Sequence, residues 1–199
     1  GRRLLTSSGG ARVTVVQDRM QRAPVFRFAS AADARDFGTW VTEHHAAIAA
    51  AAETTTRIGR LLEIEQYQVG PMRYLRFCFS TGDAAGQNMV GRATLAGCQW
   101  IVDNHPDAPQ FMLSGAIDTD KKHSDVNRLR GRGKWVVAEA VLPAQLLHDV
   151  MRVTPQQLFW ARQMSITVSY LAGSTNNGAH AANGLAALFI ATGQDVANV

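Results

Sequence analysis

The run Asp120-Lys121-Lys122 is the part of this chain most able to do chemistry. It is entered through the polar and small residues 114–119 and is followed by a second basic segment at 131–134. Two adjacent ammonium groups beside one carboxylate repel each other unless an anion lies between them. We therefore interpret the run as half of an anion-binding site; the plainer alternative is a solvated charged loop.

Several other segments combine glycine with small and polar residues, as ligand-binding loops do. They are 18–26, 81–89, 178–183 and 191–195. Together with 114–122, and in this chain order, they resemble the 3-hydroxy-3-methylglutaryl-CoA (HMG-CoA) reductase family. The resemblance implies an α+β fold, in which a small ferredoxin-like (split βαβ) cofactor domain is inserted into a larger α/β substrate-binding domain that is only partly present here.

The resemblance also implies an oxidoreductase that converts HMG-CoA to mevalonate and CoA by two hydride transfers from NADPH. Lys121 matches the lysine that stabilises the oxyanion, and Asp195 matches the aspartate that keeps this lysine protonated. We therefore expect a buried ammonium beside Asp195. By the same matching, the cofactor-binding residues are Asp83, Gly86, Asn88, Thr56 and Arg57, and the substrate-binding residues are Arg22, Ser114, Lys122, His180, Asn183 and Arg152.

The residues themselves are compatible with this cofactor site. The chain has no Gly-x-Gly-x-x-Gly after a strand, which disfavours a Rossmann site. Segment 82–86 instead lies between an expected strand and helix, where backbone N–H groups and the helix dipole can approach a pyrophosphate. The forked cation of Arg57 suits the ribose 2′-phosphate of NADPH, although a surface arginine is the alternative.

The chain departs from the family pattern in several ways. Ala116 stands where many relatives have Asn, and Met164 replaces a lysine that animal enzymes contribute across a dimer. The acidic proton donor is expected upstream of Gly1, and the histidine that protonates the CoA thiolate is expected beyond Val199. We therefore expect a portion of a longer polypeptide, a chain completed by a second chain, or a non-catalytic CoA-ester-binding relative. The resemblance also implies at least a homodimer.

Hydrophobic periodicity predicts the elements that position these residues. Between residues 24 and 113 we expect the order strand, helix, strand, strand, helix, strand of a ferredoxin-like NADP(H)-binding domain. The expected elements are a strand at 25–28, a helix capped by Ser30 that continues past His44 to Ile48, a hairpin over 62–79, a helix capped by Asp83 and a strand at 111–113.

Residues 1–23 and 114–199 are assigned to the substrate domain. After residue 114 the pattern predicts a strand over 135–142, a helix over 143–151 and a helix opened by Thr154-Pro155. An extended apolar segment over 165–174 and a helix over 181–192 follow.

The composition sets broader limits. Of the 199 residues, 46% are apolar, so the chain can bury a core, and a net charge of +4 suits an anionic ligand. Cys78 and Cys98 are interpreted as buried apolar groups, and His44 and His45 as helix-surface residues, so we expect no metal. No apolar run reaches the ~20 residues of a membrane span, and we expect a cytoplasmic protein.

An RNA-binding module is the remote alternative, because ferredoxin-like sheets and basic charge often occur together in such domains. The segment 74–79 superficially resembles their aromatic strand. It lacks the interleaved glycines, and we expect Phe77 and Phe79 to pack on helices. Our expectation is therefore that nucleic acid is not a partner.

Overall fold

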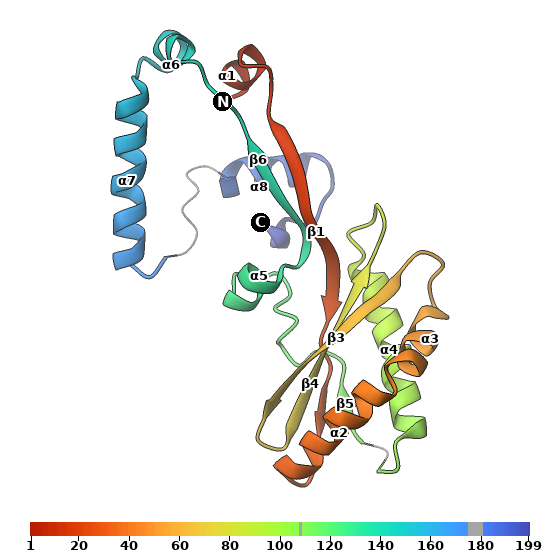
Figure 1. Ribbon diagram of the computed structural model, residues 1–199. Coiled ribbons are helices and arrows are strands. Elements are labelled where there is room, and N and C mark those ends of the chain that lie inside the picture. Colours follow the sequence, from red (N-terminus) through yellow and green to blue (C-terminus); the bar gives the residue numbers. More distant parts are fainter. Residues whose placement is uncertain (108, 175–180) are drawn as a thin grey trace. The chain divides into compact units, whose positions relative to one another are not determined.

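The computed structural model describes residues 1–107, 109–174 and 181–199, which form a mixture of α-helices and antiparallel sheet (Figure 1). The chain divides into two compact units. One is Val15–Val136; the other combines Gly1–Thr14 with Val137–Val199. The predicted assignment of residues 24–113 to a cofactor domain and of 1–23 and 114–199 to a substrate domain stays a prediction.

The sheet is organised around one central strand, β4. The strands are β1 (Arg12–Arg22), β2 (Val25–Arg27), β3 (Arg60–Val69), β4 (Met72–Ser80), β5 (Phe111–Met112) and β6 (Gly133–Glu139). Their order is β5-β2-β4-β1-β6, with β3 also paired to β4. Since β3 covers one edge of β4 along its whole length, β2 and β1 share the other edge, where Val25 lies opposite Tyr74 and Arg22 opposite Phe77.

Three helices cover one face of this sheet in Figure 1: α2 (Ala31–Glu43), α3 (His45–Glu53) and α4 (Gln87–Asn104). The core lies between them and the sheet, and burying its aromatic and aliphatic side chains is the main contribution to stability. The largest apolar members are Phe26, Phe37, Ile48, Leu75, Phe77, Phe79 and Ile101. The expectation that Phe77 and Phe79 pack on helices is confirmed.

The predicted start of α2 is confirmed, whereas its predicted continuation is wrong. Ser30 and Asp33 form a reciprocal capping box at the start of the helix. The helix ends at Glu43 instead of continuing through His44. The His44 ring stacks on Trp40 at 4.1 Å, its Nδ1 bonds the Trp40 carbonyl at 2.8 Å, and a new helix begins at His45.

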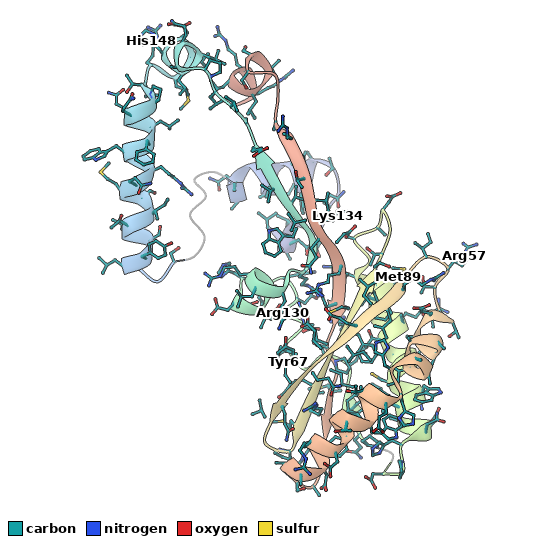
Figure 2. All side chains as sticks on the ribbon, viewed as in Figure 1. Arg57, Tyr67, Met89, Arg130, Lys134 and His148 are labelled. Atoms are coloured by element: carbon teal, nitrogen blue, oxygen red, sulfur yellow. The ribbon has the colours of Figure 1, made fainter. Side chains whose placement is uncertain are left out.

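The second face of the sheet is also buried near β4. Arg76 is fully buried, and donates to Glu65 at 3.0 Å and to the carbonyl of Gly131 at 2.9 Å. This contact holds the chain after α5 (Asp125–Arg130) against the face opposite the helices, where Figure 2 shows Tyr67 and Arg130. An unpaired buried guanidinium would cost several kcal/mol, so both partners are needed.

The other unit is mainly helical. Its elements are α1 (Arg2–Ser7), α6 (Ala144–Met151), α7 (Pro155–Leu171), α8 (Ala181–Ala191) and the 3-10 turn Val196–Asn198. Helix α1 contacts α6, and Leu4 and Leu147 are buried. Among the described residues, no helix combines the length and hydropathy needed to cross a bilayer.

The predicted helices at 143–151 and 181–192 and the helix opened by Thr154 are confirmed, but the extended segment at 165–174 is wrong. Thr154 caps α7, with Pro155 at its first position, and the helix continues to Leu171. Within it, the Thr167 hydroxyl donates to the Gln163 carbonyl at 2.9 Å, a bond that requires helical backbone. The β-branched residues of this stretch therefore do not set its conformation.

Candidate functional site

The loop carrying Lys121 and Lys122 has a strained backbone. Ala116, Thr119 and Lys121 have φ angles of 70°, 49° and 54°, in the left-handed region. Each such conformation costs about 1 kcal/mol or more for a residue other than glycine. Strain of this kind persists only where the surroundings fix it, and it concentrates at functional sites.

Hydrogen bonds from both sides of the loop fix this backbone. At its start, the Gly115 N–H donates to the carbonyl of Ala23 at 2.6 Å. At its end, the side-chain amide of Asn127 in α5 donates to the carbonyls of Thr119 at 3.2 Å and Lys122 at 3.0 Å. Helix α5 is in turn capped by the Ser124 hydroxyl. The lysines therefore project from a loop whose two ends are held in place.

Arg132 makes a further link between this loop and β1. Its Nη2 lies 2.7 Å from Asp120 Oδ1, and its Nη1 donates to the carbonyl of Gln21 at 2.7 Å. Only 10% of the Arg132 side chain is exposed, which strengthens both bonds. Lys121 directly follows Asp120, so its backbone position is set by β1.

Two predicted substrate-binding residues meet at a residue that the sequence did not single out, Asp118. Arg22 Nη1 lies 2.8 Å from Asp118 Oδ2, and the Ser114 hydroxyl donates to the same oxygen at 3.0 Å. Asp118 is buried, with 2% exposure. Its sequence signal is weak: Asp118 is a second acidic residue, two positions before Asp120, in a segment that is otherwise rich in cations. The structure brings Arg22, Ser114 and the start of the lysine loop together.

The predicted cofactor residues also converge, at the start of α4. The Thr56 hydroxyl donates to the sulfur of Met89 at 3.1 Å and accepts from the N–H of Gly59 at 2.9 Å. A Cβ placed on Gly82 would come within 3.0 Å of Ile58. Figure 2 shows Arg57 and Met89 at the same end of this unit. The segments 56–59 and 82–89 therefore form one surface.

The helix start at this surface differs from the prediction. Asp83 does not cap α4; the N-cap is Gly86, at φ 84°, and no side chain caps the helix. A Cβ on Gly86 would lie 2.3 Å from Thr81 Cγ2, so the tight turn requires glycine. The first N–H groups of an uncapped helix are suited to an anion. Asp83 and Asn88 are exposed beside them.

No described contact brings the remaining predicted residues to the Asp118 group or to the surface at the start of α4. Asp195, Asn183 and Arg152 belong to the other compact unit, where all three are exposed, and His180 lies outside the described residues. Arg57 is exposed. The expectation of a buried ammonium at Lys121 is wrong for the chain by itself, since Lys121 and Lys122 are exposed on the surface of their unit.

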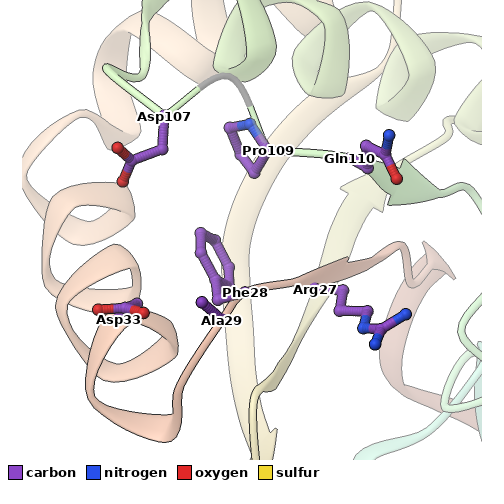
Figure 3. Close-up of a pocket in the computed structure, with 7 residues that line it drawn as sticks. All are labelled: Arg27, Phe28, Ala29, Asp33, Asp107, Pro109 and Gln110. Carbon is purple, nitrogen blue, oxygen red and sulfur yellow. The ribbon is translucent and has the colours of Figure 1, made fainter.

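A separate open cavity of about 650 Å³ lies elsewhere in the same unit, and none of the predicted site residues line it. Figure 3 shows its lining, which consists of Arg27, Phe28, Ala29, Asp33, Asp107, Pro109 and Gln110. Its walls mix an aromatic ring with charges of both signs. No arrangement of nucleophile, acid or base follows from them.

One cluster among the described residues has metal-ligand residue types: Glu63, Glu65 and Cys78. Arg19 pairs with both carboxylates, and Arg76 pairs with Glu65. Burial raises the pKa of the Cys78 thiol to about 12, so the thiol stays protonated. Because the carboxylates are already neutralised and the thiolate is disfavoured, this cluster is structural.

Comparison with known proteins gives a consistent result. A sequence model of the hydroxymethylglutaryl-coenzyme A reductase family matches residues 1–199. The chain is 41% identical to the 3-hydroxy-3-methylglutaryl-coenzyme A reductase of Aeropyrum pernix and 40% identical to that of Halobacterium salinarum. These alignments cover 100% and 98% of this chain and 48% of each relative. The chain therefore spans about half the length of these relatives.

Solved structures agree on the fold. A 3-hydroxy-3-methylglutaryl-coenzyme A reductase of Streptococcus pneumoniae superposes with a TM-score of 0.62 at 16% identity, covering 97% of this chain and 50% of that one. A second structure of that enzyme gives 0.60 at 17% identity. The chain belongs to the hydroxymethylglutaryl-coenzyme A reductase family.

Proposed function

We propose that this chain is the part of an NADPH-dependent HMG-CoA reductase that binds the cofactor and the reacting end of the substrate. The whole protein would convert HMG-CoA to mevalonate and CoA by two hydride transfers. The observation that carries the proposal is the strained loop, which holds Lys121 and Lys122 on the same segment as Ser114 and ties that segment to Arg22. Family membership supplies the reaction.

The surface at the start of α4 fits a dinucleotide. Its uncapped N–H groups and the Gly86 turn can receive a pyrophosphate, with Asp83 and Asn88 beside it. Thr56 and Arg57 would hold the ribose 2′-phosphate, which favours NADPH. The bound cofactor would supply the hydride. A class II relative from Streptococcus pneumoniae, 14% identical with a TM-score of 0.52, was solved with NADPH.

A ferredoxin-like cofactor domain is part of the same proposal. The elements follow the order β2, α2 with α3, β3, β4, α4, β5. All described pairings among these four strands are antiparallel, and β2 and β4 are central. This order and pairing support a split βαβ sandwich.

On the substrate side, Arg22, Ser114 and Lys122 would hold the glutaryl carboxylate. Lys121 would stabilise the oxyanion that forms as the acyl carbon is reduced. Asp195 would keep that ammonium protonated, and the other matched residues of its unit, His180, Asn183 and Arg152, would contact the CoA ester.

Such an electrostatic role needs a site from which water is excluded, whereas Lys121 is exposed here. We propose that a second copy of the protein covers it in a homodimer. The partner copy would also cover α7, whose large apolar side chains are exposed. Phe159 and Trp160 are each 66% exposed, and Tyr170 is 80% exposed.

Two other functions are less well supported. A non-catalytic CoA-ester-binding relative would keep the same binding residues, so only turnover separates it from the reductase. An RNA-binding module would need exposed aromatic rings on β4. Phe77 and Phe79 are at most 1% exposed, so neither ring can stack on a base.

The test is the consumption of NADPH by the full-length protein in the presence of HMG-CoA, with CoA and mevalonate measured in parallel. The proposal predicts that two NADPH are oxidised for each CoA released. Binding of NADPH and HMG-CoA without oxidation would identify the non-catalytic relative, and failure to bind either ligand would reject both.

A further inference from the structure

Two of the three groups proposed to receive the substrate carboxylate, Arg22 and Ser114, already hold a carboxylate of the chain itself. Arg22 Nη1 and the Ser114 hydroxyl both contact Asp118 Oδ2, at 2.8 Å and 3.0 Å. An arginine and a hydroxyl converging on one carboxylate oxygen is the arrangement expected for a bound acidic ligand. Asp118 therefore makes the contacts that such a ligand would make.

The neighbouring pair, Arg132 with Asp120, shows what a structural ion pair looks like in this loop. Its arginine side chain is 10% exposed and also binds a backbone carbonyl of β1, so it joins two segments. The side chain of Arg22 is 27% exposed, so a ligand can reach it. A Cβ on Gly91 would pass 3.9 Å from Arg22 Nε and Nη2, which places the guanidinium between Asp118 and the helix that begins at the cofactor surface.

We propose that Asp118 sets the affinity for the acidic substrate by competing with the substrate carboxylate for Arg22 and Ser114. The proposal rests on the proposed function. Asp118 neutralises Arg22, so this partly buried guanidinium is not left as an unpaired charge. An acyl-CoA with a terminal carboxylate can take over these contacts, whereas a neutral acyl-CoA leaves Asp118 in place and gains nothing from Arg22. The competition lowers the affinity for the acidic substrate, whereas the affinity for a neutral acyl-CoA is not affected by it.

The test is Asp118→Asn in the full-length protein, because this change keeps the shape and the acceptor oxygen but removes the charge. We expect the KM for HMG-CoA to fall roughly tenfold, the factor for one charge-assisted hydrogen bond no longer displaced. The KM for NADPH should not move. Asp125→Asn is the matched control: it removes the same charge from a carboxylate whose side chain is 80% exposed, and it should leave the KM for HMG-CoA unchanged.

Calorimetric binding of free 3-hydroxy-3-methylglutarate gives a readout that needs no turnover. We expect tighter binding to Asp118→Asn than to the native protein and to Asp125→Asn. If Asp118→Asn does not fold, Asp118→Ser replaces it in both measurements. A dissociation constant that is unchanged or larger in the Asp118 variant would overturn the proposal, as would absence of binding in all three proteins. If the native protein binds this acid but does not oxidise NADPH, the proposed function fails. The ratio of the dissociation constants of Asp118→Asn and the native protein still decides the role of Asp118.

Discussion

The guanidinium of Arg132 bridges Asp120 and the backbone of Gln21, with 2.7 Å contacts on both sides. Strand β1 therefore sets the position of the residue directly before Lys121. This relationship connects the sheet to the proposed chemistry, because a displacement of about 1 Å in a catalytic group can cost on the order of 100-fold in rate.

Replacing Arg132 tests this positioning role. We expect Arg132→Met to lower kcat for HMG-CoA reduction roughly 10- to 100-fold, with the KM for NADPH nearly unchanged, because the loop loses its link to β1. Arg132→Lys should recover part of kcat. Arg128→Met in α5 is the control, since Arg128 forms an exposed ion pair with Asp125 within the same helix. Equal losses in the Met variants of both arginines would show that Arg132 has no special role.

The left-handed conformation of Ala116, at φ 70°, gives a prediction about stability. Asn tolerates this conformation better than Ala, so Ala116→Asn should raise the free energy of unfolding by about 0.5–1 kcal/mol. Urea unfolding measures the change. Ala32→Asn, at an exposed position of helix α2, should lower stability instead, because Asn is a poorer helix former. A lower free energy of unfolding in Ala116→Asn would contradict the claim that the backbone at Ala116 is strained.

At the cofactor surface, Gly86→Ala should weaken NADPH binding. The added Cβ would lie 2.3 Å from Thr81 Cγ2 at a φ of 84°, so the turn before α4 must change shape. We expect the dissociation constant for NADPH to rise at least about tenfold, corresponding to a loss near 1.4 kcal/mol. Gly91→Ala in the same helix, where the nearest atom would be 3.9 Å away, should have no such effect. Equal NADPH dissociation constants for the two variants would show that the turn at Gly86 is not part of the NADPH site.

His105 predicts how stability depends on pH. It lies against the rings of Phe37 and Trp40, at 5.3 Å and 4.9 Å, and its Nδ1 accepts the backbone N–H of Asp107 at 3.2 Å. Burial lowers its pKa below the usual 6.5, and the charge of His44 lowers it further, against the raising effect of Asp107. In the window between the lowered pKa and 6.5, the unfolded chain binds more protons than the folded chain, so stability falls as the pH decreases through it.

Denaturant unfolding at a series of pH values measures this effect. His105→Phe should flatten the pH dependence in that window, since Phe keeps the aromatic packing and does not titrate. His123→Phe, at an exposed loop position, serves as the control. An unchanged pH profile in His105→Phe would show that His105 is not the responsible group.

Local signals predicted much of the fold. The cap at Ser30 and the Thr154-Pro155 start are local, so they could be recognised from the sequence. Strand β1 was not predicted, because its pairing, such as Met20 opposite Phe79, joins residues far apart in the chain. The segment 165–174 was misjudged because its β-branched residues favour a strand, whereas the helix begun at Thr154 continues through them.

The candidate site was predictable to a similar extent. Glycine and charge patterns identified the segments around Gly86 and Lys121, and the structure adds the contacts that join Thr56 to Met89 and Arg22 to Ser114 through Asp118. The role of Asp118 could not be predicted, because sequence does not show which cation a lone carboxylate meets. The backbone strain in the lysine loop likewise depends on long-range hydrogen bonds.

The most direct test of the account is Lys121→Ala in the full-length protein, with HMG-CoA turnover and NADPH binding measured on the same preparation. If this ammonium stabilises the oxyanion, turnover should fall by at least about 100- to 1,000-fold while NADPH affinity stays nearly unchanged. Turnover equal to that of the native protein would contradict the assignment of Lys121 and, with it, the proposed chemistry of the loop.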